Sequence, residues 1–187
     1  MANVLTGNTW YLDTVGVIWN YPVQINKIVL LPNAAGDEAI FKWYDLGTPL
    51  SAGCGSGTGT ITGTNTLTST GNLSATIKTG MVFEIVASSG SADNLSPQGV
   101  LQPKKRYRVY SDASANAVVV EDKWTNEASK VYQWKTYSSY YAAHVKKDAI
   151  TDATGTIEID FSPWPLMLPN LILDTLTTNA VVYLHIR

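Results

Sequence analysis

The feature that most constrains the fold is a run of short Thr- and Val-rich segments between Thr58 and Asp122. Thr, Val and Ile suit a pleated, half-buried surface, whereas the Gly, Asn, Asp and Ser residues between these segments favour turns. Several short strands at such spacing are typical of a small β-barrel or sandwich. The sequence therefore predicts an all-β protein, and we expect helix in less than about a tenth of the chain, against a usual third.

The two ends of the chain carry the same kind of pattern. Residues 23–31 and 39–45 alternate on either side of a strong turn at 32–37, and residues 155–161 alternate again. Near the C-terminal end, residues 171–174 and 180–186 are expected to pair as a hairpin.

Each end of the chain supplies about three strands, which are too few for a stable closed core. We therefore expect residues 1–50 and 150–187 to form one discontinuous β-sandwich with a jelly-roll-like fold. Residues 51–149 would then be an inserted small β-barrel or sandwich module. The module begins with glycines at alternate positions in 51–59, which predicts a flexible connector.

Composition excludes several classes of protein. The net charge is −2 over 187 residues, so no basic surplus favours binding to nucleic acid or to an anionic membrane. Cys54 is the single cysteine and can form neither an internal disulfide nor a cysteine-based zinc site. We see no secretion signal and no apolar run near the roughly 20 residues of a membrane span. These features predict a protein that is made in a reducing cytoplasm and released by lysis.

No pattern in the sequence predicts catalysis, a metal site or a cofactor. The glycine-rich segment lacks the Lys and the Ser or Thr that would follow the last glycine of a phosphate-binding loop. His144 and His185 are the only histidines, and neither sits in a pattern that would form a catalytic triad or a metal shell. The carboxylates are scattered along the chain, so the sequence predicts no enzyme.

Aromatic and basic side chains are the best candidates for an interaction surface. We expect Trp10, Trp43 and Trp164 to pack in the core. A second group is too dense for one small core and is assigned to an interface, with core packing and ligand stacking as open alternatives: Trp124, Tyr132, Trp134, Tyr137, Tyr140 and Tyr141. One basic cluster is expected to form a solvated or subunit-contacting strand that suits an acidic partner: Lys104, Lys105, Arg106 and Arg108.

Three stretches resemble structural proteins of tailed-bacteriophage virions. They are the opening Met1–Thr14, the ending Leu171–Leu184, and a middle module with Asn65–Thr68, Gly80–Ile85, a Tyr-Arg-Val strand and a Val-Val-Val strand. The resemblance implies a late structural protein, most directly a capsid decoration (cement) protein on the head surface. Its implied partners are the major capsid protein or other virion subunits, in a trimer or dimer of the chain. Two alternatives are a carbohydrate- or receptor-binding module of a tail or fibre, and a virion-associated hydrolase.

Overall fold

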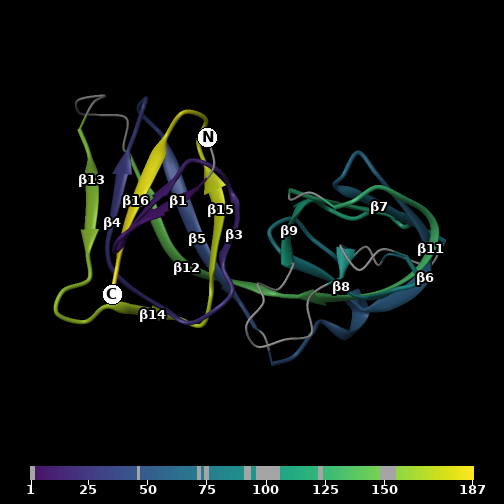
Figure 1. Ribbon diagram of the computed structural model, residues 1–187. Coiled ribbons are helices and arrows are strands. Elements are labelled where there is room, and N and C mark those ends of the chain that lie inside the picture. The colour runs from purple at the N-terminus through teal and green to yellow at the C-terminus, as the bar shows by residue number, and fades with distance from the viewer. Residues whose placement is uncertain are drawn as a thin grey trace. The chain divides into compact units, whose positions relative to one another are not determined.

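The computed structural model describes residues 3–45, 47–70, 73, 76–90, 94–95, 106–121, 124–147 and 155–187. Strands make up 59% of the structure and helices 3%, so the prediction of an all-β fold is confirmed. The chain divides into two compact units (Figure 1). Residues 1–43 and 140–187 form the first, called the sandwich unit here, and residues 44–139 form the second, called the barrel unit.

The sandwich unit is built from two antiparallel sheets. The six-stranded sheet has the order β1 (Val4–Thr6), β2 (Thr9–Leu12), β16 (Val181–Ile186), β4 (Val23–Leu31) and β13 (Ile157–Asp160), and β14 (Leu166–Leu168) also pairs with β4. The four-stranded sheet has the order β12 (Ser139–Lys146), β5 (Glu38–Tyr44), β15 (Leu171–Leu176) and β3 (Gly16–Trp19). Because β12 pairs with β5, the segment after residue 139 belongs to the sandwich sheet.

Both sheets contribute to one apolar core. Every second residue of β4 from Val23 to Leu30 is buried except at one irregular step, as expected for a strand with one face inward. Phe41 of β5 and Leu173 of β15 pack into the same cluster from the other sheet. Trp43 is half-buried and packs against this cluster, as the sequence predicted for this residue.

The predicted hairpin at the C-terminal end is wrong. Residues 171–176 form β15, which pairs with β3 and β5, whereas residues 181–186 form β16, which pairs with β2 and β4. The turn at Thr177–Asn179 therefore carries the chain from one sheet to the other. A turn sequence specifies a reversal of direction, but it does not specify which strand becomes the neighbour.

The barrel unit is a closed ring of strands (Figure 1). Its order is β10 (Ala117–Val120), β7 (Thr66–Ser69), β6 (Gly55–Thr62), β11 (Glu127–Tyr137), β8 (Val82–Ser88) and β9 (Arg106–Ser111). A short 3₁₀ turn, η1 (Ser51–Gly53), precedes β6. The strands predicted between Thr58 and Asp122 thus supply five of the six barrel strands, with β11 as the sixth, and closure leaves no free sheet edge among the six.

The glycine-rich segment is not a flexible connector. From Gly55 onward it forms β6, which pairs with β7 on one side and with β11 on the other. Gly55 lies opposite Trp134, and Gly57 lies opposite Tyr132. A Cβ atom at Gly55 would come within 2.9 Å of the Trp134 ring, so the missing side chain is what lets the ring lie over the strand.

Candidate interaction surface

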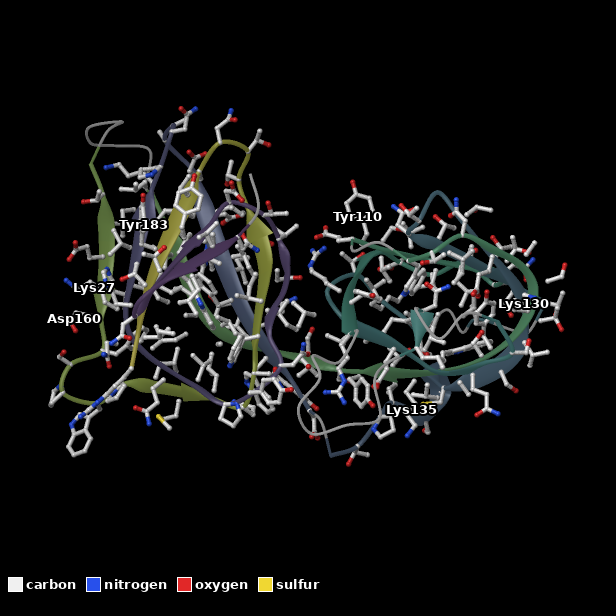
Figure 2. All side chains as sticks on the ribbon, in the orientation of Figure 1. Lys27, Tyr110, Lys130, Lys135, Asp160 and Tyr183 are labelled. Atoms are coloured by element: carbon white, nitrogen blue, oxygen red, sulfur yellow. The ribbon has the colours of Figure 1, made fainter. Side chains whose placement is uncertain are left out.

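Most of the exposed apolar side chains belong to the sandwich unit. Among the described residues, the large apolar side chains that are exposed are Val4, Leu5, Trp19, Tyr110, Val131, Tyr140, Tyr141, Trp164 and Met167. All except Tyr110 and Val131 lie in the sandwich unit. Tyr110 points outward from the barrel strand β9 in Figure 2.

The exposed apolar side chains of the sandwich unit lie on strands at the edges of its two sheets, or directly beside them. Val4 and Leu5 are on β1, the edge of the six-stranded sheet, and Met167 is on β14, which pairs with β4 and with no other strand in the described part of the chain. Trp19 is on β3, an edge of the four-stranded sheet, and β12 is its other edge. Soluble β-proteins usually protect such edges with charges, prolines or bulges. Exposed apolar groups there instead favour edges that another surface covers.

The segment between β13 and β14 holds Trp164 in solvent. Its side chain is 85% exposed, so the prediction that Trp164 packs in the core is wrong. Prolines 163 and 165 flank it, and both fix the backbone φ angle and lack an N–H group for a sheet. The Ser162 amide donates a 2.8 Å hydrogen bond to the Asp160 carboxylate, and this bond lowers the pKa of Asp160. The segment is therefore anchored at the end of β13.

A small apolar cavity lies at the opposite edge of the same sheet. It has a volume of about 170 Å³ and is lined by Asn3, Val4, Leu5, Trp10, Leu12, Ile18 and Trp19. The Trp10 and Trp19 rings meet with centroids 5.3 Å apart. The Asn3 side chain accepts hydrogen bonds from the Asp13 and Thr14 amides at 3.1 and 3.2 Å. These bonds tie the start of the chain to the loop after β2 and so fix one wall of the cavity.

The β12 edge carries the exposed part of the aromatic segment that the sequence singled out. Tyr140 is exposed but stacks on Trp43, with ring centroids 4.7 Å apart. Tyr141 is 59% exposed. Farther along the strand, His144 lies 2.9 Å from the Glu38 carboxylate on the neighbouring strand β5. An exposed ring next to a ring held by stacking is a suitable contact for a protein partner.

The other aromatic residues assigned to an interface lie inside the barrel unit. Trp124, Tyr132, Trp134 and Tyr137 are all buried, which corrects their assignment to an exposed surface. Trp124 and Trp134 pack against Phe83, with ring centroids 6.0 and 6.4 Å apart. A closed barrel has an interior that large side chains fill, and the glycines of β6 enlarge that space.

The basic cluster is not a free positive surface either. Arg106 and Arg108 are buried, and each pairs with a carboxylate: Arg106 Nε lies 3.1 Å from Glu84, and Arg108 Nη1 lies 2.7 Å from Glu121. Lys104 and Lys105 lie outside the described residues. The two arginines are thus structural ion pairs within the unit rather than contacts for an acidic partner.

Two buried tyrosines of the barrel unit also form hydrogen bonds with carboxylates. The Tyr137 hydroxyl donates a 2.8 Å hydrogen bond to Glu84, and the Tyr132 hydroxyl donates one of the same length to Glu127. Burial raises the pKa of both phenols most, and these hydrogen bonds raise it further. Both hydroxyls therefore stay protonated and act as hydrogen-bond donors at neutral pH.

The outer face of the six-stranded sheet mixes rings and charges. The Tyr11 and Tyr183 rings meet edge to face at 5.5 Å, and Lys27 lies 3.1 Å from Glu158. Figure 2 shows Lys27, Asp160 and Tyr183 on this face. His185 shares the face and lies 3.2 Å from the Thr9 hydroxyl. The side chains on this face already contact one another. Fewer large apolar side chains are therefore exposed here than at the sheet edges.

A hydroxyl-lined groove of about 540 Å³ runs over the outside of the barrel. Its lining residues are Thr58, Gly59, Thr60, Thr68, Ser69, Thr70, Asn116 and Ser129. These lining residues include no aromatic ring on which a sugar would stack, and the Thr60 and Thr70 hydroxyls already form hydrogen bonds with the backbone. The groove therefore lacks the coplanar rings that the carbohydrate-binding alternative requires.

Within the described ranges, His, Cys, Asp and Glu side chains form no group of three or more that could hold a metal ion. None of the helices in the described part of the chain has the length and apolar character needed to cross a membrane. Comparison of the chain with protein-family models, with curated proteins and with solved structures found no match.

The surface residue that sequence reasoning missed is Trp164. Its local signal was present, because a tryptophan between two prolines cannot continue a sheet ladder. The apolar edge residues Val4 and Leu5 were missed for another reason. A strand of three residues, such as β1, looks the same in sequence whether it lies at the edge or in the middle of a sheet.

Proposed function

We propose that the chain is a structural virion protein of a tailed phage, acting as a decoration (cement) protein that binds the outer surface of the head. The proposal joins the resemblance of the sequence motifs to one structural observation. That observation is the set of apolar side chains on the edge strands β1, β3, β12 and β14 of the sandwich unit. Edge strands with apolar side chains bind other protein surfaces through backbone pairing and side-chain packing.

The β12 edge is the proposed contact with the capsid. Tyr141 offers a large exposed ring, and Tyr140 beside it is held by its stacking on Trp43. Tyrosine supplies a large contact area at a low cost in conformational entropy, which suits a central contact residue. On a shell that repeats its binding site many times, copies that also contact one another gain effective concentration, so modest single contacts give firm attachment.

Co-sedimentation tests this proposal. Purified protein is mixed with empty heads of the phage whose genome encodes the chain, and the protein in the pellet is measured against protein concentration. We expect saturable binding to the heads. Tyr141→Ser should weaken it about 10-fold or more, because a tyrosine that becomes buried on binding is often an interface hot spot.

Tyr110→Ser is the matched control, because Tyr110 is 61% exposed and lies on the barrel strand β9. It should bind heads as the unchanged protein does. Unchanged protein that stays in the supernatant at saturating head concentration would overturn the cement function. Binding to tails or to glycans in place of heads would favour a receptor-binding module instead.

A further inference from the structure

The Trp164 ring is exposed and does not pack into the core of its own chain. At 85% exposure it makes almost no contact with the unit that carries it. It lies in the short segment between β13 and β14, and both of these strands pair with β4. Two flanking prolines restrict the backbone, so little conformational entropy is lost when the ring is covered. Exposed, preorganised tryptophans of this kind are typical anchors of protein interfaces.

The cavity beside β1 has the size and chemistry to receive one such ring. Its volume is about 170 Å³, and apart from Asn3 its lining is apolar or aromatic. An apolar protein cavity of about 150 Å³ is known to hold a benzene ring. Sites for drug-sized ligands are larger, at roughly 300–1,000 Å³. The cavity therefore fits a single inserted side chain better than a free organic ligand.

The ring and the cavity occupy opposite edges of one sheet. In the six-stranded sheet, β2, β16 and β4 lie between β1 and β14. At a spacing of about 4.8 Å between neighbouring strands, the two edges are roughly 19 Å apart. Trp164 therefore does not reach the cavity of its own chain, whereas the cavity of a second copy is accessible to it.

We infer that Trp164 of one copy inserts into the cavity formed by Val4, Leu5, Trp10, Ile18 and Trp19 of a second copy. The inserted indole packs against Trp19 at the rim and against the β1 side chains. Its N–H group stays at the cavity mouth, where water supplies an acceptor. The contact covers apolar groups at the β1, β3 and β14 edges together, and leaves the β12 edge free.

Such a contact is head-to-tail, because the two copies contribute different surfaces. In a pair of copies, the copy that donates Trp164 keeps a free cavity, and the copy that receives it keeps a free Trp164 ring. Contacts of this kind continue from copy to copy. They form a closed ring when the rotation that relates neighbouring copies leads back to the first copy, and an open chain when it does not. The inference concerns contacts between copies and does not depend on attachment to a phage head.

Sedimentation velocity over a range of protein concentrations tests the inference. The unchanged protein should assemble beyond the monomer. Trp164→Ala removes the ring but keeps the cavity, and should raise the dissociation constant about 30-fold or more, as expected for a tryptophan hot spot. Leu5→Glu places a charge in the cavity but keeps the ring, and should have a similar effect. Val4→Glu serves as a second cavity variant if Leu5→Glu does not fold.

Mixing the two kinds of variant gives the decisive measurement. Trp164→Ala and Leu5→Glu should each sediment as a monomer alone, whereas the mixture should form a one-to-one dimer and nothing larger. In that dimer, Trp164 of the Leu5→Glu chain occupies the intact cavity of the other chain. Tyr110→Ala is the control for removal of an exposed ring and should assemble normally.

Three results would overturn the inference. They are an unchanged protein that stays monomeric at every accessible concentration, a Trp164→Ala variant that assembles normally, and a mixture that does not form the dimer. The last result would also follow from a symmetric contact of Trp164 with Trp164. None of these results bears on binding to heads through Tyr141, which is measured separately by co-sedimentation with the Tyr141→Ser variant.

Discussion

Removing Glu84 alone should destabilise the barrel unit more than removing Glu84 together with Arg106. The two side chains are 8% and 5% exposed, and Arg106 Nε lies 3.1 Å from the Glu84 carboxylate. Glu84→Leu leaves a buried guanidinium without its counter-charge, and Arg106→Met leaves a buried carboxylate. Breaking a buried ion pair from one side costs about 3–5 kcal/mol, because the remaining charge stays desolvated.

The double variant removes both charges and so avoids that cost. It still leaves the Tyr137 hydroxyl without the acceptor that it contacts at 2.8 Å. A buried polar group that loses its partner costs about 1–3 kcal/mol. We therefore expect a loss of about 1–3 kcal/mol for the double variant, against about 6–10 kcal/mol for the sum of the single changes.

Urea unfolding followed by tryptophan fluorescence measures these differences, because Trp124 and Trp134 are buried in the barrel core. Lys78→Met is the matched control. Its partner Asp112 lies 2.9 Å away, but the two side chains are 53% and 55% exposed. An exposed pair contributes little to stability despite its shorter distance, because water screens the two charges. A double variant that is less stable than either single variant, or single variants that lose less than about 1 kcal/mol, would refute the reasoning.

Three further changes test other parts of the fold. Gly59→Ala should destabilise the barrel by about 1–3 kcal/mol in urea unfolding, because the new Cβ atom would lie 2.5 Å from a backbone oxygen of β7. Gly47→Ala is the control and should be nearly neutral, because only the tip of a flexible side chain lies near Gly47. The free energy of unfolding should fall as the pH rises above 10. Tyr132 and Tyr137 have raised pKa values in the folded chain, so both hydroxyls lose their protons at a lower pH in the unfolded chain than in the folded one. Tyr137→Phe should reduce this fall. Hydrogen bonds from the Thr79 amide and Lys78 lower the pKa of Asp112 from 3.8 to about 2, so stability should be lost as the pH falls from about 4 to about 2, and the loss should be smaller in Asp112→Asn. A pH titration of thermal unfolding that is flat in either window would contradict the corresponding expectation.

Strand positions were predictable from sequence because alternation is a local signal. The pattern of residues 23–31 coincides with β4, and the strand predicted at 155–161 contains β13. The all-β class followed from the same signal, since it repeats along most of the chain. Strand neighbours were not predictable in this way. The order of strands depends on contacts between residues far apart in sequence, as the separation of β15 and β16 into different sheets shows.

The prediction that the glycine-rich segment is a flexible connector was wrong for a physical reason that is only partly visible in the sequence. Alternating glycines remove side chains from one face of a strand, which in isolation leaves a chain with little to hold it. In the barrel the rings of Tyr132 and Trp134 lie opposite Gly57 and Gly55 and fill that face. A glycine strand and an aromatic strand are each poor elements alone and form a good pair together. The two segments are more than 70 residues apart, so reading either by itself gives the wrong result.

The same contrast explains why aromatic density was a poor guide to the interaction surface. A closed barrel turns one face of every strand inward, so an aromatic-rich strand such as β11 fills the interior rather than the surface. An open sandwich has edges, and an aromatic residue near an edge is covered only if another element lies over it. The partner of each ring is therefore more informative than the number of rings. Trp134 lies opposite a glycine and is buried, whereas Trp164 lies between two prolines that prevent any ladder from forming beside it, and is exposed. The burial of a tryptophan in a β-protein thus follows from whether its backbone joins a ladder and from the space that the facing strand leaves for its ring.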